Sequence, residues 1–201
     1  MNQFNQTFYI YKTSYIKDEV PDVGFLPMLM RRKLSSIGKT AIYTMNEVYE
    51  GNDIKLVYAS NYGELERVKK LLDQKNTEGV MSPTGFSFSV HNSSVGLFSL
   101  LNKINSPYSS ISAGENSLSA GILESVITND DVLFCFAESV GGLRGAACTF
   151  GRKPRVGAIK AELLPNDGKT SAAGFDDFVN FLNGAKDEYV SDFYVLRRYN
   201  G

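Results

Sequence analysis

Few side chains in this sequence could carry covalent chemistry. The 201-residue chain has one histidine, His91, and two cysteines, Cys135 and Cys148. A strand-like run at 108–112, YSSIS, leads into the turn Ser112-Ala113-Gly114-Glu115-Asn116, and a helix-like segment follows. A residue just ahead of a helix N-terminus lies in a positive local field, and backbone N–H groups there can hold a developing oxyanion. The turn therefore has the layout of an acyl-transfer site, but it contains no cysteine.

The histidine offers one way to build a nucleophilic site near this turn. His91, in SVHNSSVG, could act as the base for Ser112 or Ser117. The sequence places no carboxylate as the third, orienting member, so we favour a structural hydrogen-bonding role for His91, beside Asn92 at a helix start. Gly114 has no side chain for chemistry, and glycine adopts φ > 0 without steric cost, so an ordinary turn glycine is the simpler interpretation.

The two cysteines are poor candidates for the missing nucleophile. Cys135 lies in the apolar run VLFCFA at 132–137, where a thiol is inert, and Glu138 after it is interpreted as structural. Cys148, in GAACTFG, is expected to be non-catalytic, although it stays the alternative nucleophile. Two cysteines are too few for a disulfide framework and too far apart for a zinc motif. We expect a reduced, cytoplasmic protein with no metal and no cofactor.

The segment GGLRGAACTFGRKPR at 141–155 is predicted to be a glycine-rich basic loop. It lacks the pattern of a phosphate-binding loop. Its cations have two interpretations: a docking patch for an acidic carrier protein, or a solvated loop, which we favour. The cations concerned are Arg144, Arg152, Lys153 and Arg155.

The elements that position these residues are predicted to be alternating strands and helices. Strands are predicted at 4–16, 54–60, 108–112, 132–137 and 156–164. Helices are predicted at 28–49, 63–72, 92–104, 115–127 and 174–182, and 187–200 is ambiguous between strand and helix. This order predicts an α/β fold with a mixed or mostly parallel sheet flanked by helices. The length fits one domain over 1–201.

Composition excludes two classes of function. A formal net charge of −1 gives no support for nucleic-acid binding as the main role, because such binding needs a basic face. No apolar run approaches the ~20 residues of a membrane span, and the N-terminus lacks the layout of a signal peptide.

Three stretches carry a specific resemblance. SPTGFSFSVHNSSVGLFSLL, SPYSSISAGENSLSAG and DDVLFCFAE resemble the N-terminal half of β-ketoacyl synthases, which have a thiolase-like fold. RRKLSSIGKTAIYTMNEVYE and IKLVYASNYGELERV extend the resemblance over roughly 28–140. The chain is most similar to the chain-length-factor-like proteins of aryl polyene and polyketide clusters. The fold implied is the N-terminal half of a thiolase-like fold.

The resemblance changes the meaning of the turn. In active synthases this turn reads Thr-Ala-Cys-Ser-Ser-Ser-Leu or a close variant. Ala113 then matches the alanine and Gly114 the nucleophilic cysteine, while Glu115 and Asn116 match small or hydroxyl residues and Ser117 matches the end of the motif. The catalytic histidines and lysine of the family belong to the C-terminal half, which we expect this chain to lack. The resemblance thus implies a non-catalytic subunit that supports a 3-oxoacyl carrier-protein synthase.

The implied partner is an active ketosynthase subunit or a second copy of the chain, and an acyl carrier protein is a further candidate. Synthase dimers pair the strand before the turn across a two-fold axis, and 108–112 is the matching strand. Half of the fold would also expose a helix that packs on the other half. The alternatives are a stand-alone acyltransferase or thioesterase that uses a serine or Cys148, and a carrier-protein-binding module. Candidate acyl-channel or interface residues are Phe86, Phe88, His91, Asn92, Tyr108 and Ile111.

Overall fold

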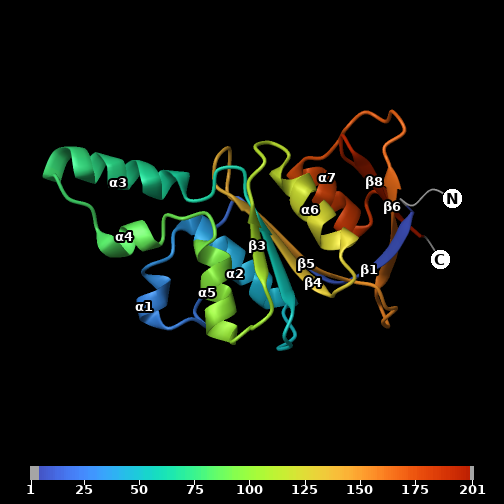
Figure 1. The fold of residues 1–201 in the computed structure, drawn as a ribbon, viewed down its shortest axis with the longest axis horizontal. Coiled ribbons are helices and arrows are strands. Elements are labelled where there is room, and N and C mark those ends of the chain that lie inside the picture. Colours follow the sequence, from blue (N-terminus) through green and yellow to red (C-terminus); the bar gives the residue numbers. More distant parts are fainter. Residues whose placement is uncertain (1–4, 200–201) are drawn as a thin grey trace.

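The computed structural model describes residues 5–199, and they form one eight-stranded mixed sheet (Figure 1). The strands are β1 (Gln6–Lys17), β2 (Lys55–Ala59), β3 (Tyr108–Ile111), β4 (Val132–Glu138), β5 (Arg144–Gly151), β6 (Ile159–Pro165), β7 (Glu188–Val190) and β8 (Tyr194–Arg198). Their order is β3-β2-β4-β5-β1-β6-β8-β7. β2 runs parallel to β3 and β4, and the other neighbours are antiparallel. The predicted mixed α/β fold is confirmed, and residue 4 of the first predicted strand lies outside the described residues.

Helices cover both faces of the sheet. They are α1 (Met28–Arg31), α2 (Ser36–Val48), α3 (Leu65–Glu78), α4 (Pro83–Ser87), α5 (Ser93–Asn102), α6 (Ser117–Ile127) and α7 (Phe175–Asn183). α2 and α5 enclose one core against β2 and β4, and α6 and α7 enclose the other (Figure 1). None of these helices combines the length and the apolar composition needed to cross a bilayer.

Two capping serines set helix starts that periodicity did not reveal. The helix predicted at 28–49 is divided into α1 and α2, because the Ser35 hydroxyl accepts a hydrogen bond from the Gly38 N–H at 3.1 Å. α4 was not predicted as a separate helix. Ser82 caps it in the same way, accepting from the Gly85 N–H at 3.1 Å, and Pro83 occupies its first turn.

The prediction of a glycine-rich loop at 141–155 is wrong for most of that range. Its middle is β5, and every residue from Gly145 to Gly151 is buried. The glycines allow close packing: a Cβ at Gly145 would lie 2.3 Å from Thr40 Cγ2, and one at Gly151 would lie 2.1 Å from the Tyr11 hydroxyl. Small residues therefore mark close contacts with α2 and β1 here, and the resemblance of their composition to a loop is misleading.

The C-terminal part of the chain completes the sheet. The ambiguous segment 187–200 holds β7 and β8, whose Tyr189, Tyr194 and Leu196 are buried. α7 lies beside α6 over the same face, where Phe178 meets Phe134 edge to face at 6.0 Å between ring centres. Among the longer helices α3 is the least buried, with only Leu71 enclosed, and the short helices α1 and α4 have no buried residue. α3 and α4 project from the body of the molecule (Figure 1).

Candidate functional site

The turn at 112–116 joins β3 to α6, as its strand–helix pattern predicts. Gly114 has φ of +58°, and a Cβ there would meet no atom within 4 Å. Glycine is therefore favoured at this position by the left-handed backbone conformation. There is enough space for a larger side chain. The buried Ser117 hydroxyl donates to the Gly114 oxygen at 2.7 Å and accepts from the Ala113 N–H at 2.8 Å. Ser117 thus closes the turn and is not exposed as a nucleophile.

His91 contacts neither of the serines considered from the sequence. Its Nδ1 lies 2.6 Å from the Ser110 hydroxyl and its Nε2 lies 3.0 Å from the Ser60 backbone oxygen. The Ser112 hydroxyl donates to the Asn61 oxygen at 3.2 Å instead. His91 therefore links β3 to the end of β2, on the side of the sheet that α5 covers.

Glu138, at the end of β4, organises the loops around this histidine. Its Oε2 accepts hydrogen bonds from the Asn61 and Tyr62 N–H groups at 2.9 and 3.0 Å, and from the Ser60 hydroxyl at 3.2 Å. Its Oε1 accepts from the N–H groups of the next two residues, Ser139 and Val140, at 2.9 and 3.1 Å. The side chain is 3% exposed. One buried carboxylate therefore holds the chain segments that leave β2 and β4.

Neither cysteine is accessible. Cys135 and Cys148 are fully buried, and they face opposite sides of the sheet. Burial raises the pKa of Cys135 to about 12 and raises the pKa of Cys148 well above its ordinary value. The Cys148 thiol therefore stays protonated and out of reach of a substrate at neutral pH. No cluster of three or more metal-binding side chains occurs within residues 5–199.

A family model described as "Beta-ketoacyl synthase, N-terminal domain" matches residues 10–139, which is more than half of the chain. The chain belongs to the β-ketoacyl synthase N-terminal domain family. No curated protein matches it significantly.

Solved structures share the fold of this synthase domain. One chain of "Ketosynthase (ApeO) in Complex with its Chain Length Factor (ApeC) from Xenorhabdus doucetiae" matches with a TM-score of 0.72 and 21% identity, over 96% of this chain and 99% of that one. "The ishigamide ketosynthase/chain length factor" matches with a TM-score of 0.61 and 12% identity, over 79% of this chain and 66% of that one. A third match is "AntDE:AntF (apo): type II PKS acyl-carrier protein in complex with its ketosynthase bound to the hexaketide". Its TM-score is 0.61 and its identity is 11%, over 90% of this chain and 75% of that one. These TM-scores show a common fold, and the predicted thiolase-like half is confirmed.

The predicted channel or interface residues of this synthase domain lie on β3, on α4 and at the start of α5. Tyr108 is 42% exposed on β3, which is the edge of the sheet with β2 as its one neighbour. Ile111 is half-buried and packs on the α6 side. Phe86 is 57% exposed on α4, whereas the half-buried Phe88 packs against the core under α5. Asn92 is the exposed residue before α5.

The four basic residues lie at two ends of β5 and do not form one patch. Arg144 begins the strand, opposite Glu138, and donates to the Gly141 oxygen. Arg152, Lys153 and Arg155 follow its last residue, and an eight-residue strand is roughly 25 Å long. A docking role for these cations stays a prediction.

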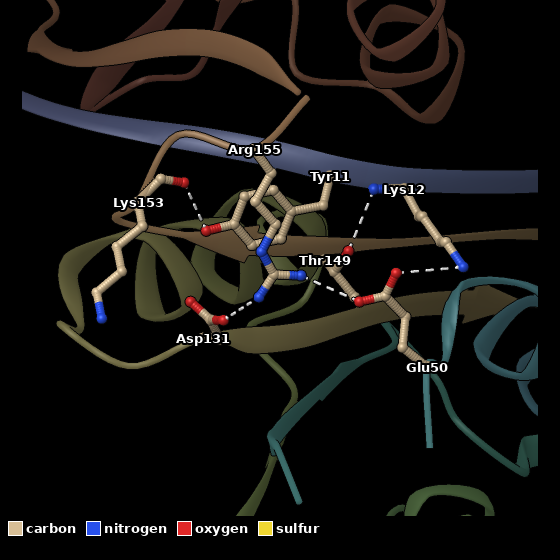
Figure 2. Close-up of polar contacts among 7 residues, drawn as sticks. All are labelled: Tyr11, Lys12, Glu50, Asp131, Thr149, Lys153 and Arg155. Atoms are coloured by element: carbon tan, nitrogen blue, oxygen red, sulfur yellow. Dashed lines mark hydrogen bonds and ion pairs between the residues drawn. The ribbon is translucent and has the colours of Figure 1, made fainter. Parts of the chain in front are cut away.

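Arg155, one of the three cations that follow β5, is held by contacts within the protein. Figure 2 shows its guanidinium over the Tyr11 ring, with Cζ 3.8 Å from the ring centre. Its Nη2 pairs with Asp131 at 2.6 Å and its Nη1 with Glu50 at 3.0 Å. The Tyr11 hydroxyl donates to the Lys153 oxygen at 2.9 Å (Figure 2). Arg155 thereby joins β1 to the loops before β2 and β4.

Arg152 has a comparable structural role, because its guanidinium binds the end of α6 and the start of β1. It donates to the Thr128 oxygen at 3.0 Å and to the Val126 oxygen, and also to the Thr7 oxygen at 2.8 Å and the Gln6 amide oxygen at 2.9 Å. Cations commonly satisfy the last carbonyls of a helix in this way.

We expect Arg152→Ala to lower the free energy of unfolding by about 2 kcal/mol, because it leaves partly buried carbonyls without donors. Lys153→Ala, at the exposed neighbouring position, should change it by less than about 0.5 kcal/mol. Urea denaturation followed by circular dichroism measures both. Equal losses in the two variants would contradict this assignment.

Sequence reasoning missed the residues that surround His91. Ser60 and Ser110 are 31 and 19 residues away in the chain, and Gly63 lies under the ring. No periodic spacing links a residue after β2 to one on β3, so a single sequence holds no signal for this cluster.

Proposed function

We propose that this domain is a non-catalytic, chain-length-factor-like subunit of polyketide or fatty-acid-type biosynthesis. It pairs with an active ketosynthase in the cytoplasm and helps to shape the channel that receives the growing acyl chain. The observation that carries the proposal is Gly114. The strand, turn and helix that position a nucleophile in the family are all formed, and the nucleophile position has no side chain.

The edge of the sheet supports pairing through β3. The Pro107 carbonyl accepts a hydrogen bond from the Leu56 N–H on β2, and the Ile111 carbonyl accepts one from the Ser60 N–H just after β2, at 3.2 Å each. Backbone groups alternate in direction along a strand, so those of Tyr108 and Ser110 point to the free edge. An unpaired edge of this kind is a template for another strand. The neighbours described as ketosynthase and chain length factor complexes suggest the partner.

The arm formed by α3 and α4 supports the same face. Leu72, Val80 and Phe86 are 52%, 63% and 57% exposed, and Phe86 belongs to the segment that leads to His91. Large apolar side chains exposed along one projecting arm are typical of an interaction surface. A partner on β3 and this arm would also cover the turn. An acyl carrier protein, present in one similar complex, is a further candidate partner.

Analytical ultracentrifugation of this chain with a candidate ketosynthase from the same genome tests the proposal. We expect a 1:1 complex that condenses acyl and malonyl carrier-protein thioesters, whereas the chain alone does not condense them. Tyr108→Pro removes one outward N–H at the start of an edge strand, where proline is tolerated. It should weaken association more than tenfold, through the lost hydrogen bond and the blocked approach of the partner strand.

Tyr108→Ala is the matched control, because it removes the side chain and keeps the N–H. It should weaken association less than Tyr108→Pro does. Wild-type affinity in Tyr108→Pro would exclude pairing through β3. Condensation by the chain alone would overturn the non-catalytic assignment.

A further inference from the structure

His91 and Ser110 form a hydrogen-bonded pair with a defined direction. Nδ1 of the ring lies 2.6 Å from the serine oxygen, and Nε2 lies 3.0 Å from the Ser60 backbone oxygen. A carbonyl oxygen only accepts hydrogen bonds, so Nε2 carries a proton. In the neutral ring Nδ1 is then the acceptor, and the Ser110 hydroxyl donates to it.

The surroundings hold the ring in this orientation. Tyr58, buried in β2, meets the ring edge to face at 5.5 Å between centres. Gly63 packs closely against the imidazole ring, because a Cβ at this position would lie 2.9 Å from His91 Cδ2. The hydroxyl of Ser60, whose backbone oxygen accepts from Nε2, donates to the buried carboxylate of Glu138 at 3.2 Å. Nucleophile, base and an orienting acceptor are thus in the arrangement that activates a serine.

We propose that Ser110 is a nucleophile, activated by His91, that accepts an acyl group from a thioester or another activated ester. The Ser110 oxygen attacks the carbonyl carbon, its bond to that carbon forms, and the carbon–sulfur bond breaks. The hydroxyl proton passes to Nδ1 and from there to the departing thiolate. The Nε2–H bond to the Ser60 oxygen supports the imidazolium that exists between these two transfers. This activity is separate from the proposed subunit function and does not depend on it.

The pair is not sealed inside the protein. Ser110 and His91 are both half-buried, and neither is enclosed in the core. The backbone groups of Ser110 point to the sheet edge, whereas its side chain is directed to the histidine on the α5 side, so a strand paired with β3 leaves the hydroxyl in place. The segment before His91 exposes Phe86 and Val90, which offer apolar surface to an acyl chain.

The first test labels the whole chain with an alkyl fluorophosphonate, and intact mass and peptide mapping locate the adduct. We expect one adduct, on Ser110. It should disappear in Ser110→Ala, form about 100-fold more slowly in His91→Gln, and be unchanged in Ser109→Ala, whose side chain faces the opposite side of the strand. No adduct, an adduct on another residue, or undiminished labelling of Ser110→Ala would overturn the proposal.

A second test reads the base directly and does not depend on the folding of His91→Gln. Because Cys135 and Cys148 are fully buried, iodoacetamide reports only on an introduced thiol. A thiol beside a histidine ionises at lower pH, so Ser110→Cys should be alkylated at lower pH than Ser109→Cys. Identical pH profiles for the two variants would overturn the proposal. The labelling uses the chain without a ketosynthase, so its failure would leave pairing through β3 untouched.

Discussion

Glu138→Ala is expected to lower the free energy of unfolding by about 3 kcal/mol, because each buried donor left without a partner costs about 1–3 kcal/mol. The variant removes the acceptor of four backbone N–H groups and of the Ser60 hydroxyl. Water can reach some of these loop N–H groups, so the losses do not add fully. Urea denaturation at pH 7 measures the effect.

Two comparisons isolate the role of the carboxylate. Glu138→Gln keeps one oxygen and the shape of the side chain, so it should lose less than Glu138→Ala does. Glu78→Ala removes an exposed carboxylate at the end of α3 and should stay within about 0.5 kcal/mol of wild type. A Glu138→Ala variant as stable as Glu78→Ala would show that the loops after β2 and β4 do not depend on Glu138.

Stability is expected to fall steeply above about pH 9, where unfolded thiols ionise. Burial raises the pKa of Cys135 from 9.0 to about 12 and raises the pKa of Cys148. Burial also raises the pKa of Tyr58, Tyr189 and Tyr194 above 10.0. Above pH 9 the folded state therefore binds more protons than the unfolded state, and the free energy of unfolding falls as pH rises. The stability that these buried, protonated groups contribute is fully present below about pH 9. It is lost as the pH rises from about 9 to about 12.

The size of this effect makes it measurable. Each buried group contributes about 1.4 kcal/mol per pH unit once its unfolded form is ionised, so the two thiols together approach about 3 kcal/mol per unit. Urea midpoints should stay level from pH 7 to about pH 9 and fall from there to pH 11. The double variant Cys135→Ala/Cys148→Ala should show a shallower fall between pH 9 and pH 10, where the tyrosines contribute least. A midpoint that is constant up to pH 11 would contradict the burial of these groups.

Local sequence patterns predicted the elements whose signals are local. The run 132–137 is apolar at every position, and it is the buried centre of β4. The four-residue spacing of Leu118, Ile122 and Val126 predicted α6, and all three are buried. The same patterns failed at β5, because its glycines and alanines are small in order to admit α2 and Tyr11. Neighbours that are distant in sequence set that requirement.

The sequence by itself determined the family resemblance and the strand–turn–helix at 112–116, with glycine where a nucleophile would lie, because these depend on residues that adjoin one another. Only the tertiary structure decided that His91 meets Ser110 and not Ser112 or Ser117, and that Glu138 binds the loop after β2. These contacts join residues 19 to 78 positions apart, and the parallel pairing of β3, β2 and β4 brings them to one end of the sheet. Hydrogen bonds of this kind are set by the register of the sheet, which periodicity along a single strand does not encode.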